Sequence, residues 1–185
     1  HVGLNPRRIG FYNLLKKHGA KIKFKNIKKN NHEFVGDIHV RHSSLKPIKA
    51  NSTYYASTTD EYPILFVIAA LTKGTSVFRG IGDLANKESN RITEMKKILT
   101  QVGVKFKISK SEMKIFGVPK VKKTNVNIKV PNLGDHRICM STVILSLVSG
   151  VEAEIKNFET VGTSAPSFLK IIKLLGGKFE IKKKL

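Results

Sequence analysis

An internal repeat is the feature that most limits the folds open to this chain. Three segments share one order: an amphipathic helix, a glycine, and a strand in which apolar and polar residues alternate. The predicted helices cover residues 8–18, 91–102 and 165–175, the glycines are Gly19, Gly103 and Gly176-Gly177, and the strands cover residues 20–24, 104–108 and 178–181. Apolar helix residues recur at spacings of three and four, and glycine suits the left-handed position that ends a helix. This order predicts a fold made of repeated α/β units.

Two further predicted helices are apolar on almost every side. They cover residues 63–71 and 138–148, and each is followed by a glycine and then a strand, over residues 75–79 and 151–155. A helix that is apolar all round is typical of a protein interior. We therefore expect both helices to be buried.

The remaining pattern completes the repeating unit. Short strands are also predicted over residues 36–40, 113–116 and 125–130, and loops over residues 25–31, 43–53 and 118–124. The unit reads strand, buried helix, strand, exposed helix and two strands. The predicted fold class is mixed α/β of the α+β type, with βαβαββ repeats packed around buried helices. We expect one domain over residues 1–185, with units near residues 1–45, 59–116 and 134–185.

The strong positive charge does not by itself indicate a nucleic-acid partner. The formal net charge is +21, and lysines supply most of the positive charges. Nucleic-acid binders usually add arginines and exposed aromatics, whereas tryptophan is absent here and most phenylalanines fall at core-like positions. A solvated lysine-rich surface explains the composition most simply, and a field that attracts small anions is the alternative. We expect no nucleic-acid partner.

Cysteine content and apolar run length bear on location. The single cysteine, Cys139, lies in an apolar run, which excludes a disulfide framework and favours a reducing compartment. The longest apolar runs, residues 63–71 and 143–148, are too short to cross a bilayer. We therefore expect a cytoplasmic protein with no membrane partner. Because the chain begins at His1 and enters a helix pattern almost directly, we expect it to be a piece of a longer polypeptide.

A dense charged stretch stands at the start of the predicted helix at residues 91–102. Lys87 and Arg91 are four residues apart, so on a helix they would share a face and converge on one anion. Glu88 would point off that face as a lone acid or base. A helix N-terminus adds unpaired N–H groups. A capped surface helix with a salt-bridge pair would show the same pattern.

Other polar clusters precede the remaining helices. Asp60 precedes the first apolar helix, and Asp135, His136 and Arg137 precede the second. Either aspartate could be only an N-cap. A cap does not account for His136 and Arg137 at the start of a buried helix, where charge is costly unless it is paired or used. The cluster around Thr163 could cap the last helix or bind an oxyanion.

Taken together, these residues suit phosphate and carboxylate ligands with acid–base chemistry. The sequence contains no glycine-rich nucleotide loop and no zinc-like cysteine and histidine spacing. A nucleotide site and a metal site therefore have little support in the sequence.

Four of these motifs occur in the order found in the 5-enolpyruvylshikimate-3-phosphate synthase family, which the chain resembles. They are Asp60-Glu61-Tyr62-Pro63-Ile64-Leu65, Lys87-Glu88-Ser89-Asn90-Arg91, Asp135-His136-Arg137-Ile138-Cys139-Met140 and Thr163-Ser164-Ala165-Pro166-Ser167-Phe168. Residues 5–10 and 41–46 also look like that family, and the Asp-Glu-Tyr-Pro-Ile form resembles its class II branch. The match spans essentially the whole chain, but only the C-terminal portion of a full family member.

The resemblance implies a specific reaction. The family transfers the enolpyruvyl group of phosphoenolpyruvate to the 5-hydroxyl of shikimate 3-phosphate and releases phosphate, without metal or cofactor. It implies one domain of an inside-out α/β barrel, with the N-terminal domain absent from this chain. Since the family's active site lies between two domains, we expect this chain alone to be inactive and the full-length enzyme to be a monomer.

The resemblance also implies a role for each matched residue. Asp60 would be the base that takes the hydroxyl proton, Lys87 would contact shikimate 3-phosphate, and Glu88 would move a proton to and from the methylene carbon. Arg91 and Arg137 would hold the carboxylate of phosphoenolpyruvate. The remaining residues implied in substrate binding are His136, Asp135 and Thr163.

Several positions depart from the usual family pattern, among them Ala85-Asn86, which stand where Arg-Val is common. Asn90 replaces an aspartate, which would remove a partner of a neighbouring cation. Thr163 stands where class I members place a lysine, and Asp83 where they have an asparagine. The alternatives are an enzyme like UDP-N-acetylglucosamine enolpyruvyl transferase, which lacks the matched motif pair, and a non-catalytic basic α/β module that binds nucleic acid.

Overall fold

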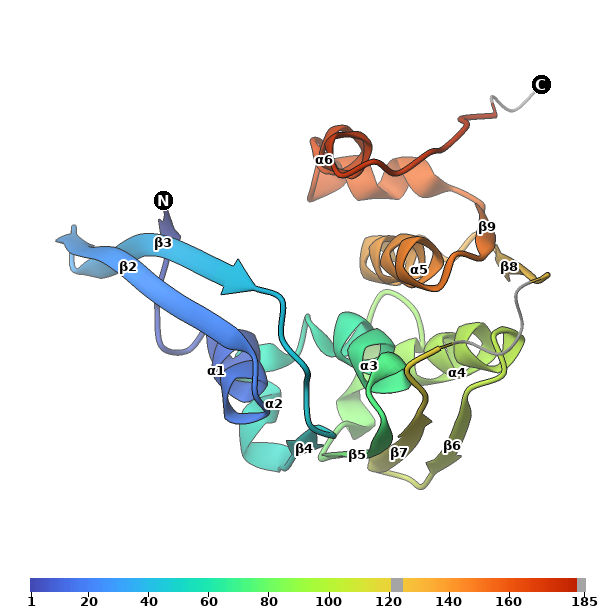
Figure 1. Ribbon diagram of the computed structural model, residues 1–185, viewed down its shortest axis with the longest axis horizontal. Coiled ribbons are helices and arrows are strands. Elements are labelled where there is room, and N and C mark those ends of the chain that lie inside the picture. The colour runs from blue at the N-terminus through green and yellow to red at the C-terminus, as the bar shows by residue number, and fades with distance from the viewer. Residues whose placement is uncertain (121–124, 183–185) are drawn as a thin grey trace.

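Helices and strands alternate along most of the chain (Figure 1). The computed structural model describes residues 1–120 and 125–182. The helices are α1 (Gly10–Lys17), α2 (Tyr55–Thr58), α3 (Tyr62–Leu71), α4 (Arg91–Gln101), α5 (His136–Ser149) and α6 (Phe168–Leu174), with 3-10 turns η1 (Ser52–Tyr54), η2 (Gly82–Asn86) and η3 (Phe158–Thr163). The strands are β1 (Val2–Gly3), β2 (Lys21–Asn30), β3 (Glu33–Arg41), β4 (Lys49–Ala50), β5 (Gly74–Arg79), β6 (Lys105–Ile108), β7 (Glu112–Gly117), β8 (Asn127–Val130) and β9 (Glu152–Ile155). Every predicted helix is present, with ends shifted by a few residues.

Within residues 1–120 and 125–182 the strands form three separate sheets. One has the order β1-β3-β2 and is antiparallel. The second has the order β4-β5-β7-β6, in which only the β4–β5 pair is parallel. The third is the parallel pair β8-β9. This mixture of parallel and antiparallel pairing confirms the predicted α/β class, while the division into three repeat units stays a prediction.

Helix α3 is the centre of the core. It contacts β7 on one side and α4 and α5 on the other, so it lies between layers (Figure 1). Leu65, Phe66 and Ala69 are fully buried, and the Phe66 ring packs edge-on against Phe78 of β5 with centroids 5.1 Å apart. The prediction that residues 63–71 form a buried helix is confirmed.

Helix α5 is buried or half-buried as far as Ser146 and exposed near its C-terminal end. Ile138 and Leu145 are fully buried, whereas Val148 is 66% exposed. The neighbouring helix α6 lies beyond α5 in Figure 1 and exposes Leu174 and Leu175. The prediction of a fully buried helix is therefore wrong for the end of α5, where Leu147 and Val148 are 40% and 66% exposed.

Residues 25–30 are a strand rather than the predicted loop. Strand β2 pairs with β3 from Lys21 opposite Arg41 to Asn30 opposite Glu33, with an irregularity between Lys25 and Lys28. The two linking residues, Asn31 and His32, have positive φ angles of 44° and 67°, which suits a tight turn of the kind that closes hairpins. Pairing with β3 thus overrides the polar composition of this segment.

Two other predictions need correction. Residues 178–181 form no strand, because β9 pairs only with β8 in the described structure and no strand lies beside this segment. A strand without a hydrogen-bonded neighbour is not stable. The predicted loop at residues 43–53 contains β4 and η1, and residues 121–124 of the third predicted loop lie outside the described residues.

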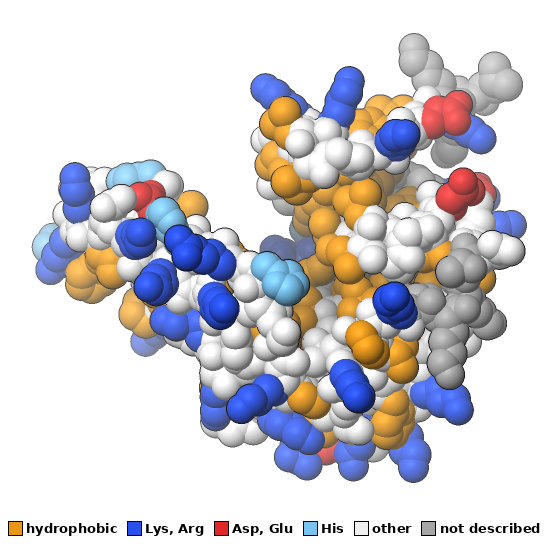
Figure 2. All heavy atoms as spheres, in the orientation of Figure 1, with side chains coloured by type: hydrophobic (Ala, Val, Ile, Leu, Met, Phe, Trp, Pro, Cys, Tyr) orange, Lys and Arg blue, Asp and Glu red, His pale blue; other side chains and the backbone are white. Residues whose placement is uncertain are grey.

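The view in Figure 2 shows a face hollowed between the β2–β3 hairpin and the α5–α6 part of the molecule. Lysine and arginine side chains crowd the hairpin, and apolar side chains follow the inner edge of the α5–α6 part. In the described residues, no helix combines the length and apolar character needed to cross a membrane.

Candidate functional site

Arg91 is the centre of a cluster of charges drawn from three parts of the chain. Its side chain is fully buried at the start of α4. Its Nη2 donates to Glu88 Oε2 at 2.6 Å, and its Nε donates to Asp135 Oδ2 at 3.0 Å. Its Nη1 lies 3.7 Å from Asp60 Oδ1 and has no hydrogen-bond partner. A buried guanidinium surrounded by carboxylates is stable only because they compensate its charge.

Arg137 joins the same cluster from the first turn of α5. Its Nη2 lies 3.1 Å from Asp60 Oδ2, and its Nη1 donates to the backbone oxygen of Asp60 at 3.3 Å. Asp60 therefore contacts both guanidiniums, and it does not cap α3, whose N-cap residue is Glu61. We refer to Asp60, Glu88, Arg91, Asp135 and Arg137 as the charged cluster.

Asp135 is both a helix cap and an ion-pair partner. One carboxylate oxygen accepts from the backbone N–H groups of Arg137 and Ile138, which confirms the predicted cap of α5. The other accepts from Arg91 and from Ser89 Oγ at 2.9 Å. Burial alone would raise the pKa of Asp135, but the hydrogen bonds from Arg91 and Ser89 outweigh it and hold that pKa below its usual value.

The stretch from Lys87 to Arg91 is not helical in the way its spacing suggests. Helix α4 begins at Arg91, and Lys87 has an extended backbone. Lys87 and Arg91 therefore do not share a helix face, and that prediction is wrong. Glu88 was expected to point away from the cations, but it pairs with Arg91. The cause of both differences is that Asn90 caps α4, so that Lys87, Glu88 and Ser89 lie before the helix begins.

The position of Asn90 accounts for asparagine in place of the aspartate that is usual in the family pattern. Its side-chain oxygen accepts from the backbone N–H of Thr93 at 3.0 Å, so Asn90 is the N-cap of α4. Asparagine caps a helix about as well as aspartate. Arg91 takes its partners from Asp60, Glu88 and Asp135, so its compensation does not depend on a carboxylate at position 90.

Lys87 is held by a separate pair of residues beside the cluster. Its Nζ lies 2.9 Å from Asp83 Oδ2, and the same oxygen accepts from the Tyr55 hydroxyl at 2.9 Å. The hydrogen bond to Asp83 raises the pKa of Lys87, and the bonds from Lys87 and Tyr55 lower the pKa of Asp83. No local sequence pattern points to Tyr55 as a partner of Asp83, because the two residues are 28 positions apart.

The other predicted site residues lie at the edge of this group. His136 is the first residue of α5 and is half-buried. Thr163 is exposed at the end of η3, and its hydroxyl donates to the backbone oxygen of Thr160 at 2.8 Å. Thr160 in turn donates to Gly134, next to Asp135. Thr163 is thus near the loop that leads into α5, but its hydrogen bond points back to its own turn.

Glu61 is a neighbour of the cluster that the sequence did not single out. Burial raises the pKa of Glu61, and the charge of Asp60 raises it further, while Arg137 opposes both. A half-buried carboxyl group of this kind can hold a proton more readily than an exposed one.

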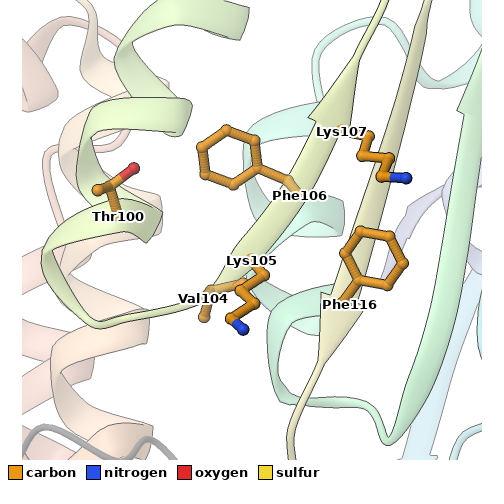
Figure 3. A pocket seen from close by; sticks show the side chains of 6 residues that line it. All are labelled: Thr100, Val104, Lys105, Phe106, Lys107 and Phe116. Carbon is orange, nitrogen blue, oxygen red and sulfur yellow. The ribbon is translucent and has the colours of Figure 1, made fainter.

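Two hollows on the described surface lie apart from the charged cluster. One, of about 490 Å³, lies between α4 and the β6–β7 hairpin and is lined mainly by Phe106, Phe116 and Val104, with Lys105 and Lys107 (Figure 3). Another, of about 240 Å³, includes Lys49 and Arg79. Neither contains a residue of the cluster.

Sequence comparison identifies the family to which these motifs belong. Residues 1–172 match the family described as EPSP synthase (3-phosphoshikimate 1-carboxyvinyltransferase). The chain belongs to the EPSP synthase family. The resemblance seen in the sequence is therefore confirmed.

Individual relatives agree with this membership. The chain is 35% identical to the 3-phosphoshikimate 1-carboxyvinyltransferase of Paramagnetospirillum magneticum, covering 96% of this chain and 40% of that protein. It is also 35% identical to the enzyme of that name from Zymomonas mobilis, covering 98% of this chain and 40% of that protein. The chain spans about 40% of the length of these relatives.

Solved structures show the same relationship in three dimensions. EPSP synthase from Acinetobacter baumannii superposes with a TM-score of 0.85 at 31% identity, covering 98% of this chain and 42% of that one. The enolpyruvyl transferase NikO from Streptomyces tendae superposes with a TM-score of 0.61 at 13% identity, covering 91% of this chain and 35% of that one. The second likeness concerns the fold alone. These neighbours confirm the predicted enolpyruvyl transferase fold.

Proposed function

We propose that this chain supplies one half of an active site that transfers the enolpyruvyl group of phosphoenolpyruvate to the 5-hydroxyl of shikimate 3-phosphate. The observation that carries the proposal is the charged cluster, in which family motifs more than 70 residues apart meet through the Asp60–Arg137 contact. The cluster combines carboxylates for proton transfer with guanidiniums for anionic groups. These are the two requirements of an addition–elimination at an enol phosphate.

The proposed roles follow the reaction. Asp60 takes the proton of the 5-hydroxyl, whose oxygen bonds to the phosphate-bearing carbon of phosphoenolpyruvate. Glu88 gives a proton to the methylene carbon in this addition. It then takes a proton back from the methyl group as the bond to phosphate breaks. Lys87, held by Asp83, faces the anionic sugar, and Arg137 with Arg91 holds the enolpyruvyl carboxylate.

The hydrogen bonds of Asp135 distinguish it from the residues proposed to meet substrate. Asp135 is fully buried and its oxygens are already used by Arg91, Ser89 and the N-terminus of α5. We propose that Asp135 positions Arg91 instead of contacting substrate. His136 and Thr163 are accessible enough to border a ligand, and their substrate contacts stay predictions.

The remaining part of the site belongs to the other domain. The described residues cover about two fifths of the relatives' length, so we propose that this domain acts with the missing N-terminal domain of the same polypeptide, in the cytoplasm and without a cofactor. The alternatives of a UDP-N-acetylglucosamine enolpyruvyl transferase and of a nucleic-acid module have no support among the relatives.

The test joins this chain to the missing domain and measures phosphate release from the two substrates. Asp60→Ala and Glu88→Ala should each lower kcat by about a hundredfold or more, because each removes a proton-transfer group. Substrate binding should remain in Glu88→Ala. The matched control is Glu33→Ala, which removes an exposed carboxylate on the β2–β3 hairpin. Unchanged turnover in both site variants would refute the assigned roles.

A further inference from the structure

The carboxylate of Asp60 lies between two guanidiniums of the site. Its Oδ2 is 3.1 Å from Arg137 Nη2, and its Oδ1 is 3.7 Å from Arg91 Nη1. In the proposed function, these same two guanidiniums hold the carboxylate of a substrate. A carboxylate of the protein therefore occupies the place that a ligand carboxylate would take.

This contact has the properties of a replaceable one. The side chains of Asp60 and Arg137 are 32% and 29% exposed, so a dissolved anion can reach the pair. The distance to Arg91 is too long for a hydrogen bond, and Arg91 Nη1 is buried without a hydrogen-bond partner. A buried N–H group in this state gains free energy when a better-placed acceptor arrives.

The contact between Arg91 and Asp135 is different. Both side chains are fully buried, their atoms are 3.0 Å apart, and Asp135 also caps α5. Removing Asp135 from this position would leave buried charge and an uncapped helix, so it is fixed. Among the carboxylates around Arg91, Asp60 is thus the one that also contacts the partly exposed Arg137. Its contact with Arg91 is too long for a hydrogen bond.

We propose that Asp60 is an internal competitor of the anionic substrate: it occupies the Arg91–Arg137 anion site in the free protein, and a substrate carboxylate displaces it. Displacement replaces one carboxylate by another between the guanidiniums, so charge compensation of Arg91 is kept. It also frees both oxygens of Asp60 to accept a proton. Anion binding and release of the base are in this way one event. The identity of the displacing anion rests on the proposed function, but the competition itself does not.

The test measures binding of pyruvate, which carries a carboxylate but no phosphate, to the 185-residue chain by isothermal titration calorimetry. In Asp60→Asn the competing charge is gone, and we expect the Kd for pyruvate to fall about tenfold. Asp37→Asn makes the same change of charge on the β2–β3 hairpin, away from both guanidiniums, and should leave the Kd within about twofold. Arg137→Gln should weaken binding about tenfold or more.

A second measurement applies if Asp60→Asn does not fold. In the unsubstituted chain labelled with ¹³C at its aspartate carboxyl groups, saturation with pyruvate should shift the Asp60 signal and leave the Asp37 signal in place. An unchanged or higher Kd in folded Asp60→Asn, or an unmoved Asp60 signal at saturation, would overturn the proposal, as would a chain and an Asp60→Asn variant that both fail to bind pyruvate. If Asp60→Asn binds more tightly but the completed enzyme releases no phosphate, the competition stands and the proposed function falls.

Discussion

At the scale of single residues, the state of Arg91 depends on partners that are distant in sequence. Asp135 is 44 residues away, and its carboxylate is buried together with the guanidinium. Neither charge could be buried alone, because the loss of hydration would cost several kcal/mol per ion. The pair also links the start of α4 to the start of α5, so two family motifs are held in register by one contact.

Asp135→Ala should therefore destabilise the chain strongly. It removes the only fully buried carboxylate partner of Arg91 and leaves the guanidinium with Glu88 and the more distant Asp60. It also removes the cap of α5, so we expect the free energy of unfolding to fall by about 3–5 kcal/mol. Urea denaturation followed by circular dichroism measures this change. Asp83→Ala removes an exposed carboxylate that pairs with Lys87, and it should cost much less. Equal losses in the two variants would contradict the buried-pair account.

The pH dependence of this contribution has a defined sign. The pKa of Asp135 is held below its ordinary value of 3.8, so the folded state binds this proton less readily than the unfolded state. The stabilisation is complete above the unfolded pKa and is lost as the pH falls through the folded pKa. We expect the difference in unfolding free energy between the unsubstituted chain and Asp135→Asn to be constant from about pH 5 to 7. It should shrink below the ordinary pKa. Urea titrations at a series of pH values measure it, and a difference that grew towards acid pH would have the wrong sign.

At the scale of elements, the packing of strand β7 against helix α3 depends on a close approach between their backbones. Strand β7 ends at Gly117, where an added Cβ would collide with the backbone oxygens of Ala69 and Thr72 at the end of α3. Backbone atoms cannot rotate away as side chains do. The glycine is thus required by helix–sheet packing, although nothing in the local pattern of the strand distinguishes it.

Gly117→Ala should destabilise the chain by at least about 2 kcal/mol, since β7 or α3 has to shift to accept the methyl group. The matched control is Gly3→Ala in β1, where an added Cβ meets no atom within 4 Å and the change should stay within about 0.5 kcal/mol. Thermal unfolding of both variants tests the comparison. Similar transition temperatures would mean that the helix–sheet approach is looser than the structure shows.

At the scale of the whole molecule, apolar surface is concentrated at the C-terminal end. Val148, Leu174 and Leu175 are all exposed by more than 60%, and β9 has a neighbouring strand on one side only in the described structure. Exposed apolar surface of this kind usually marks an interface. The chain spans about 40% of its relatives' length, and this surface lies uncovered in the described structure.

Leu174→Lys should reduce self-association of the 185-residue chain without loss of stability. Leu174 is 78% exposed, so its replacement should change the free energy of unfolding by no more than about 0.5 kcal/mol. Ile172→Lys makes a comparable substitution on the same helix at a site only 3% exposed, and should cost about 3 kcal/mol or more. Sedimentation velocity and urea denaturation measure the two effects. A large stability loss in Leu174→Lys would show that its side chain is packed.

Most helices and strands could be predicted because their signals are local. Periodic apolar residues, and glycines such as Gly19 and Gly103 with positive φ, act within one or two turns of the chain. The predictions that were wrong concern segments whose conformation depends on a neighbouring strand. Residues 25–30 are a strand because β3 lies alongside, and residues 178–181 are not a strand because no partner lies beside them in the described structure.

The same division applies to the candidate site. By itself the sequence determined which side chains carry charge and which family the motifs resemble, and it offered Asp60 and Asp135 as caps, of which Asp135 is one. Only the tertiary structure decided that Arg91 is buried, that Glu88 turns back to it, and that Asp60 stands between two guanidiniums. The physical reason is that a cap forms within a few residues, whereas an ion pair joins whichever charges the packed elements bring within reach.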